Sequence, residues 1–526
     1  GTHRSTFFDS EICGADTGNG PLKDDPFFGA PVNFLGMLVD LEPYGSLSSQ
    51  LFFDKMSFGI DGGDQIIGKP TTRFTDRYVN FGRTTGGFRA GVGSVIWQTT
   101  FAKADLKINA FDSSALKALA AAIEDDDVLG LTVQWNAYHT VYFNDPATTN
   151  KSVPAAPLLF AKLEGGGFQP NPARSLHVGV IGLWRKGESV SEPCDRALMQ
   201  QQSAVATAHA RVTKSAIVLD LSNSIPENTF SLNPAELTKQ DLGELTLAAG
   251  TAQVTFDYSK YDMNAYLQTA GIVTLPITAD PSADLQLLDS KQNVLLAEQD
   301  LRAIPTIPNL YVDEGADAEV KFQLYDRGVP ASTAGIEVTV YALTADANTI
   351  LTTITLQTAS DGTATLPIST STPGITAYAA WAGPNPVAPT QGLDPQAYTF
   401  EYVRILPADA NIAALPPTFA NVFAYVLSDW KAMAPCMDNW LDLANETQIR
   451  AFAPMIRKLT DPAYFEAYRY MPVTRDMTAG ERALLYNFLG PAPPSHLLKA
   501  AAAAPAEKPM AKFAQLSKVS RSGSGE

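Results

Sequence analysis

The residues with the clearest chemical potential are four consecutive carboxylates between a helical and an apolar stretch: Glu124, Asp125, Asp126 and Asp127. They have three interpretations, namely oxygen ligands for a hard metal ion, partners of arginines in a salt-bridge network, or a solvated surface. We favour the salt-bridge network, because negative charge at the end of a helix opposes the helix dipole and needs cations nearby. Arg185 and Lys186 would supply these cations if their segment forms a neighbouring strand.

Two of the five histidines lie in strand-like stretches and are candidate ligands. His139 alternates with Val133 and Trp135, so we expect it on the core face of its strand. His177 begins the stretch HVGVIGLWRKGE, whose glycines would admit either a flat ligand or close backbone packing. Histidine is a common haem and metal ligand, but a lone histidine on an apolar face more often belongs to the core.

Signatures of other chemistries are absent from the sequence. No histidine follows a glutamate by three positions, so the Glu-x-x-His motif of ferritin-like di-iron sites is missing. No nucleophile elbow, phosphate-binding loop or dinucleotide fingerprint occurs either. Cys13, Cys194 and Cys436 are far apart and match no zinc or haem-attachment spacing, so we expect buried free thiols and a reducing, cytoplasmic location.

Length and charge exclude several classes of protein. A chain of 526 residues is too long for one core and should form three or four domains. The net charge of −17, without a basic stripe, argues against a nucleic-acid partner. No apolar run approaches the roughly 18 residues of a membrane span, and no signal peptide is visible, so we expect no membrane partner.

The elements that must position these residues are mostly strands. We predict a mostly β fold of tandem β-sandwich-like modules, one of them immunoglobulin-like, with a small C-terminal helical cluster. One helix, from Ser113 to Ile123, interrupts the first module. The predicted parts are a β-rich N-terminal domain (1–215), a β-sandwich-like module (216–305), an immunoglobulin-like domain (306–405), a helical cluster (406–490) and a flexible tail or linker (491–526).

The helical cluster is predicted from apolar residues that recur every three or four positions. One helix follows Thr418, and a second starts at Asn445 and should be kinked by Pro454. A third starts at Thr478, where Glu481 completes a capping box.

Three segments carry a resemblance to a known family: IEDDDVLGLTVQ (Ile123–Gln134), HVGVIGLWRKGE (His177–Glu188) and YRYMPVTRDMTAGE (Tyr468–Glu481). Together they resemble the imine-dimer synthases of violacein and indolocarbazole biosynthesis, the iminophenyl-pyruvate dimer and chromopyrrolate synthases. The similar region is the one that precedes the ferritin-like domain of those enzymes.

The resemblance implies an activity and its components. In that family two molecules of an aryl-pyruvate imine, such as indole-3-pyruvate imine, are coupled oxidatively. It implies a small aromatic substrate, haem or iron as cofactor, and a ferritin-like domain or subunit as partner. His139, His177 and Arg185 lie in the family-like strands and are the catalytic candidates, with the two histidines as cofactor ligands. The four carboxylates are the candidate metal site.

Two functional hypotheses therefore stay open. The first is an enzyme, or an enzyme subunit, of aromatic natural-product biosynthesis that couples imines. The second is a non-catalytic β-sandwich scaffold or binding protein that works with a separate ferritin-like partner. The three segments favour the first, whereas the missing ligand motifs and the immunoglobulin-like stretch favour the second.

Overall fold

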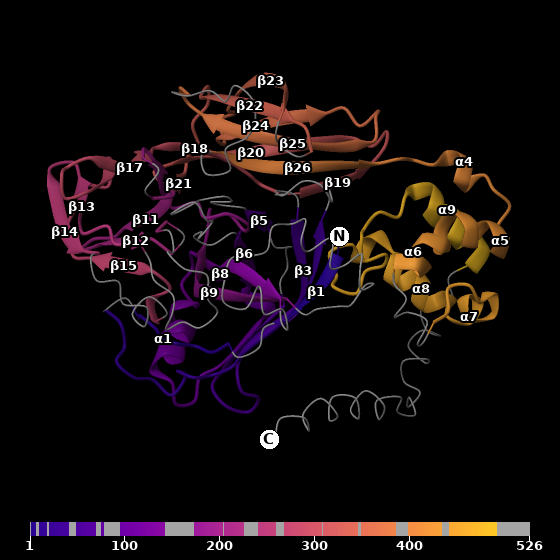
Figure 1. Cartoon of the computed structure of the whole chain (residues 1–526), viewed down its shortest axis with the longest axis horizontal. Helices are drawn as coiled ribbons and strands as arrows, with labels where there is room; N and C mark the ends of the chain where they lie inside the picture. The colour runs from indigo at the N-terminus through magenta and orange to yellow at the C-terminus, as the bar shows by residue number, and fades with distance from the viewer. Residues whose placement is uncertain are drawn as a thin grey trace. The chain divides into compact units, whose positions relative to one another are not determined.

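The chain folds into two compact units in this computed structural model (Figure 1). Unit 1 comprises 1–407 with 466–469, and unit 2 comprises 408–465 with 470–526. The structure describes residues 2–6, 10–17, 20–40, 49–69, 75–77, 95–142, 173–202, 205–222, 224–225, 240–258, 268–307, 309–345, 349–385, 398–433 and 441–491. The predicted tail lies outside these residues, except for position 491.

Unit 1 begins with two antiparallel sheets that share one core. Phe34 from the first sheet meets Trp135 from the second edge to face, with ring centroids 5.7 Å apart. The first sheet has the order β1 (Thr2–Thr6), β2 (Val32–Asp40), β3 (Ser49–Gly59), β4 (Gln65–Gly68), β7 (Leu106–Asn109). The second has the order β5 (Thr75–Arg77), β6 (Val95–Ala102), β8 (Val128–Tyr142), β9 (Ala173–Arg185).

The predicted first helix is confirmed as α1 (Ser114–Ala122), and it leads directly into the carboxylate run. Ser113 caps it by accepting a hydrogen bond from the Leu116 N–H group. Asp25 holds the same helix start, because its carboxylate accepts the Ser113 and Ser114 hydroxyl groups at 2.6 and 2.7 Å. Burial raises the pKa of Asp25, but these hydrogen bonds and two from backbone N–H groups outweigh burial and hold it at about 2.

The next module is one eight-stranded antiparallel sheet with a leucine-rich core. Its strands, in sheet order, are β14 (Ala252–Asp257), β13 (Glu244–Ala249), β16 (Leu285–Leu288), β17 (Val294–Gln299), β10 (Arg196–Gln200), β11 (Ala208–Val212), β12 (Ile217–Asp220) and β15 (Ile272–Leu275). The sheet thus recruits two strands from before position 216, where the sequence suggested a boundary, because β10 and β11 pair with β17 and β12.

The third module is a two-sheet sandwich, as the alternating pattern predicted. One sheet contains β18 (Leu301–Pro305), β20 (Ala318–Asp326), β21 (Val329–Pro330) and β24 (Thr363–Ile368). The other has the order β19 (Asn309–Asp313), β26 (Thr399–Leu406), β25 (Gly374–Ala382), β22 (Glu337–Leu343), β23 (Ile350–Gln357). The finer assignment to an immunoglobulin-like topology stays a prediction. The mostly β fold is confirmed.

Unit 2 is the predicted helical cluster. Its helices are α4 (Ala410–Ala413), α5 (Phe419–Val422), the π-helical turn η3 (Phe423–Leu427), α6 (Ser428–Met433), α7 (Glu446–Ala451), α8 (Ala453–Thr460), the short η5 (Pro462–Tyr464) and α9 (Ala479–Leu489). The helix predicted after Asn445 breaks at Phe452, because Pro454 lacks the N–H group that a continuous helix needs. The capping box of Thr478 and Glu481 is present as predicted.

Candidate functional site

The carboxylate run and the Arg185 segment are brought together by antiparallel pairing of β8 with β9, in which Val128 lies opposite Arg185. The Arg185 Nη1 atom donates to the Asp127 Oδ2 atom at 2.5 Å. The Lys186 N–H group donates to the Asp127 carbonyl oxygen at 2.8 Å. The hydrogen bond from Arg185 lowers the pKa of Asp127. This pair is the ion pair that the sequence predicted.

The other three carboxylates of the run, Glu124, Asp125 and Asp126, are exposed. The Lys103 ammonium group reaches only the carbonyl oxygen of Asp125, at 3.1 Å. Among the residues that the structure describes, no three His, Cys, Asp or Glu side chains converge as a set of metal ligands. A cation bound by the run stays a prediction.

His177 lies half-buried on the core face of β9, opposite Ala137 of β8. The glycine two positions on, Gly179, packs against Trp135: a Cβ atom added at Gly179 would lie 2.5 Å from the Trp135 Cβ atom. Of the two explanations for this glycine, close packing is the one observed. A side chain larger than glycine at position 179 would therefore collide with the neighbouring strand β8.

His139 belongs to β8, but its side chain lies outside the described residues. The predicted alternation holds up to Trp135, since Leu131, Val133 and Trp135 are all buried. The pairing of β8 with β9 then shifts register between Ala137 and Thr140. A bulge of this kind places an extra residue in one strand and re-aims side chains. The role of His139 as a ligand stays a prediction.

The Trp184-Arg185-Lys186 stretch continues into a tight turn that fastens several modules of unit 1. The indole N–H group of Trp184 donates to the Glu188 carbonyl oxygen at 3.1 Å, and the Glu188 carboxylate accepts the Arg185 N–H group at 2.8 Å. The Tyr325 hydroxyl group, from the third module, donates to the Gly187 carbonyl oxygen at 2.9 Å. The turn is therefore a structural joint.

The chain then runs through a linker, Gly187–Arg196, which is buried at positions 191–194 and at 196 and which we call the junction segment. Its Glu192 and Cys194 are 8% and 5% exposed. Arg302 of β18 donates to the Pro193 carbonyl oxygen at 2.9 Å and lies 3.4 Å from the Glu192 carboxylate. Burial raises the pKa of Cys194 to about 12, helped by the Asp195 carboxylate, so this thiol stays protonated and unreactive.

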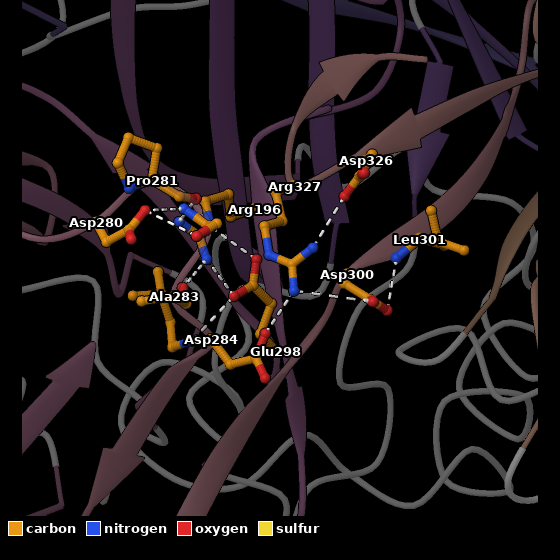
Figure 2. Close-up of polar contacts among 12 residues, drawn as sticks. Arg196, Asp280, Pro281, Ala283, Asp284, Glu298, Asp300, Leu301, Asp326 and Arg327 are labelled. Atoms are coloured by element: carbon orange, nitrogen blue, oxygen red, sulfur yellow. Dashed lines mark hydrogen bonds and ion pairs between the residues drawn. The ribbon is translucent and has the colours of Figure 1, made fainter. Parts of the chain in front are cut away.

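The junction segment ends in a buried ion pair between Arg196 and Glu298 (Figure 2). The two side chains are 4% and 1% exposed. The Arg196 Nε atom donates to Glu298 at 2.6 Å, and a second guanidinium nitrogen also contacts that carboxylate. Further donations go to the carbonyl oxygens of Pro281 and Ala283. The guanidinium is thus satisfied on every side, as burial of a charge requires.

Arg327 extends this network to the third module (Figure 2). It donates to Asp284 at 2.6 Å and to Asp326 at 3.1 Å, and Asp300 lies 3.9 Å away. These arginines were missed by the sequence reasoning. The signal was available for Arg196 and Arg302, because each is a lone charge in an apolar strand (RALMQ and LRAIP), and a buried arginine needs partners.

A small cavity lies beside the junction, lined by residues that include Met199, Arg302 and Thr399. Its volume of about 10 Å³ holds one water molecule. An aromatic substrate does not fit this cavity.

The third family-like segment lies largely in unit 2, at Tyr470–Glu481. Arg475 is 1% exposed, and its Nη1 atom donates to the Val473 carbonyl oxygen at 2.8 Å. Its guanidinium lies 5.7 Å from the centre of the Tyr470 ring. Burial raises the pKa of Glu481 to about 7, and the carboxylates of Asp409 and Asp476 add to this. The segment therefore builds the start of α9.

Comparison with known proteins identifies one similar enzyme. No protein-family model matches the chain. A curated relative, 2-imino-3-(indol-3-yl)propanoate dimerase of Chromobacterium violaceum, is 26% identical over 399 residues, or 72% of this chain. The chain resembles an imine dimerase. It spans about a third of that dimerase, since the match covers 35% of the relative. The resemblance inferred from the three segments is thus confirmed.

Solved structures add little to the comparison with the dimerase. The D0-D1 domain of intimin is 13% identical and covers 36% of this chain and 89% of its own, with a TM-score of 0.14. Native E. coli α2-macroglobulin is 11% identical and covers 73% of this chain and 26% of its own, with a TM-score of 0.16. Scores this low carry no argument. In the part of the chain that the structure describes, every helix is too short or too polar to cross a membrane.

Proposed function

We propose that this chain belongs to an enzyme of aromatic natural-product biosynthesis that couples two aryl-pyruvate imines oxidatively. The observation that carries the proposal is the similarity to 2-imino-3-(indol-3-yl)propanoate dimerase over 72% of the chain. The substrate class is a small aromatic imine. The cytoplasm is the proposed location, and the free thiols Cys13 and Cys194 support it, since a reducing compartment keeps thiols unpaired.

The proposed reaction has a simple balance. One carbon–carbon bond forms between two imine molecules, which together lose two electrons and two protons. Hydrogen peroxide would take up both and become two molecules of water. An amino-acid oxidase that makes the imine from an amino acid and dioxygen releases this peroxide, so the preceding step would supply both reactants.

Within this enzyme, the contacts of the described residues support a structural role for this chain, in shaping and holding the substrate site. Arg185 is committed to Asp127, and the turn that follows it joins three modules, because Glu188 accepts from Arg211 of the second module and Gly187 accepts from Tyr325 of the third. The buried arginines of the junction are fully engaged as well. We therefore propose that a ferritin-like domain or subunit contributes to catalysis beside this chain, and that His139, His177 and Arg185 are candidates for direct contact with substrate or cofactor.

The test is an assay of the purified chain with imine made in place from tryptophan by an amino-acid oxidase. We expect the coupled dimer in the mass spectrum when a ferritin-like partner is supplied, and little without it. Absorption and iron analysis of the chain alone would show whether it carries haem. Product from neither mixture, together with an iron-free and colourless chain, would contradict the imine-coupling proposal.

The ligand candidates are tested by two variants, His139→Ala and His177→Ala. If either histidine holds haem, its variant loses the haem absorption band, whereas His3→Ala, outside both strands, keeps it. Unchanged haem content in both variants would remove these histidines from the proposal.

The second candidate function is a non-catalytic scaffold that works with a separate ferritin-like chain. The observation that favours it is the structural use of the Trp184–Glu188 turn: Trp184, Arg185 and Glu188 bond to one another within the turn, and the Gly187 carbonyl oxygen accepts from Tyr325 of the third module. A scaffold would raise the activity or the stability of its partner. The way in which the partner's rate depends on imine concentration would stay the same. Dimer formation by the chain alone would reject it.

A further inference from the structure

Strand β23 (Ile350–Gln357) forms the outer edge of its five-stranded sheet. It pairs with β22 on one side only, and within the described residues no strand pairs with its other side. The edge is also open to solvent, since most of its residues are exposed and Leu351 is 59% exposed. An edge strand of this kind presents a row of backbone N–H and C=O groups to any partner that approaches.

This edge lacks two protections that folded proteins commonly use. Natural edge strands carry lysine, other charges or proline, which prevent pairing with another chain. Positions 349–359 contain no charged residue and no proline. One irregularity is present: the pairing shifts register between Ala342 and Leu343, which leaves Leu351 as an extra residue. The regular part of the edge therefore runs from Thr352 to Gln357.

The two faces of this regular part have different chemistry. Ile354 and Leu356 are half-buried and pack on the core of the sandwich. Thr353, Thr355 and Gln357 are exposed on the opposite face. Any strand added to this edge must match an apolar row on one face and a polar, uncharged row on the other.

We propose that the β23 edge binds the β23 edge of a second copy of this chain, antiparallel and about a two-fold axis at Thr355. In this register Thr355 lies opposite its own copy, Ile354 lies opposite Leu356, and Thr353 lies opposite Gln357. Apolar side chains meet apolar ones and polar meet polar on both sides of the axis. Two antiparallel copies of one strand obey two-fold symmetry, which is the commonest symmetry of protein dimers.

Charge sets a condition on this dimer. Each chain carries a net charge of −17, so two copies repel each other at long range. The edge itself is uncharged, and salt screens the remaining repulsion. Dimerisation should therefore strengthen as salt is added. An interface built on ion pairs would weaken instead.

The first test measures molar mass by light scattering and sedimentation over a range of concentration and salt. We expect dimers for the natural chain. The variant Thr355→Lys places two ammonium groups opposite each other across the axis, so its dimer dissociation constant should rise by about tenfold or more. Thr355→Glu should have the same effect, and mixing the two variants should restore dimers, because the facing charges are then opposite.

The matched control is Gln253→Lys on β14, an exposed edge position of the other large sheet. It adds the same charge away from β23 and should leave the dimer intact. Thermal melting followed by circular dichroism shows that each variant is folded. A natural chain that stays monomeric throughout, or a dimer that both Thr355 variants leave unchanged, would overturn the proposal.

A second measurement does not depend on charge. In a background of Cys13→Ser and Cys436→Ser, the variant Thr355→Cys brings two thiols face to face at the axis. Mild oxidation should then give a covalent dimer, since opposite positions in antiparallel strands lie within disulfide reach. Gln253→Cys should stay monomeric on a denaturing gel. Equal cross-linking of both variants would show random collision and would reject the β23 interface.

Discussion

Arg302 donates a hydrogen bond of 2.9 Å to the carbonyl oxygen of Pro193 and so fastens the first strand of the third module to the junction segment. The same guanidinium lies 3.4 Å from the Glu192 carboxylate, and both side chains are nearly excluded from solvent. A buried charge of this kind stabilises a fold only while its partner is present. The junction therefore depends on a pair of residues that the sequence places 110 positions apart.

Replacing Arg302 with methionine should destabilise unit 1 strongly. Arg302→Met leaves the Glu192 carboxylate buried without its cation, so the free energy of unfolding should fall by about 3 kcal/mol or more. The double variant with Glu192→Gln should recover part of the loss, because it removes the stranded charge. Urea denaturation measures both. Lys321→Ala is the control: it breaks an exposed pair with Glu319 at 3.2 Å and should cost at most about 1 kcal/mol.

A substitution at Gly187 tests how tightly the turn after β9 is packed. Its φ of +85° disfavours any side chain, and a Cβ atom there would lie 2.5 Å from the Pro330 Cγ atom. Gly187→Ala should therefore lower the free energy of unfolding by about 2–3 kcal/mol, through backbone strain plus overpacking. Gly315→Ala is matched in φ, at +80°, but meets no atom within 4 Å, and should cost about 1 kcal/mol. Equal losses of unfolding free energy in the two variants would show that Pro330 moves aside without cost.

Asp25 should make the first module sensitive to acid. Its folded pKa of about 2 lies below the ordinary value of 3.8, so its stabilising effect is complete above pH 4 and is lost as pH falls toward 2. Asp25→Asn should cost about 2 kcal/mol at pH 7 and much less at pH 2 to 3. Unfolding curves at several pH values would show this convergence. The adjacent, exposed Asp24→Asn should change little at any pH.

Much of the fold could be predicted from local patterns in the sequence. Ser113 and Thr478 mark two helix starts that the structure confirms, since an N-cap acts over three or four residues. The Arg185–Asp127 pair was also predictable, because it follows from antiparallel pairing of two recognisable strands. Each of these inferences needs only neighbours along a helix or across one sheet.

The rest depends on packing between distant segments. Nothing local indicates that Arg302 reaches Pro193, or that Tyr325 reaches Gly187, because these contacts depend on how whole modules dock. The alternation that placed His139 on the core face also ignores the register shift between Ala137 and Thr140. A lone arginine in an apolar strand was the one usable sign of a buried junction.

Variants of Arg185 and Asp127 distinguish the two proposed roles of this segment, which are contact with substrate and structural support. Its ion pair with Asp127 is exposed, with side chains 36% and 57% exposed, and should contribute less than about 1 kcal/mol. If Arg185 also contacts substrate, Arg185→Met should lower kcat/KM for imine coupling about 100-fold or more, by loss of a charge-assisted contact. Asp127→Asn frees the same arginine and should leave kcat/KM nearly unchanged. Equal activity of both variants would assign Arg185 to structure alone.

Glu481 should make unit 2 more stable in weak acid than in weak base. Burial, with the nearby carboxylates of Asp409 and Asp476, raises its folded pKa to about 7, far above the value of 4.5 for an unburied glutamate. Between these two pH values the folded state binds more protons than the unfolded state. The free energy of unfolding should therefore fall as pH rises from 5 to 7, by up to about 1 kcal/mol per pH unit.

Glu481→Gln isolates this effect, because glutamine still accepts the Thr478 N–H group and preserves the capping box, while it cannot ionise. Denaturation of this variant between pH 5 and 8 should lack the slope. Glu446→Gln is the matched control: it changes a glutamate in the first turn of α7 that is 46% exposed, and should keep the slope of the natural chain. If Glu481→Gln kept the slope too, the proton would have to be bound elsewhere in unit 2, with Asp409 and Asp476 the next residues to substitute.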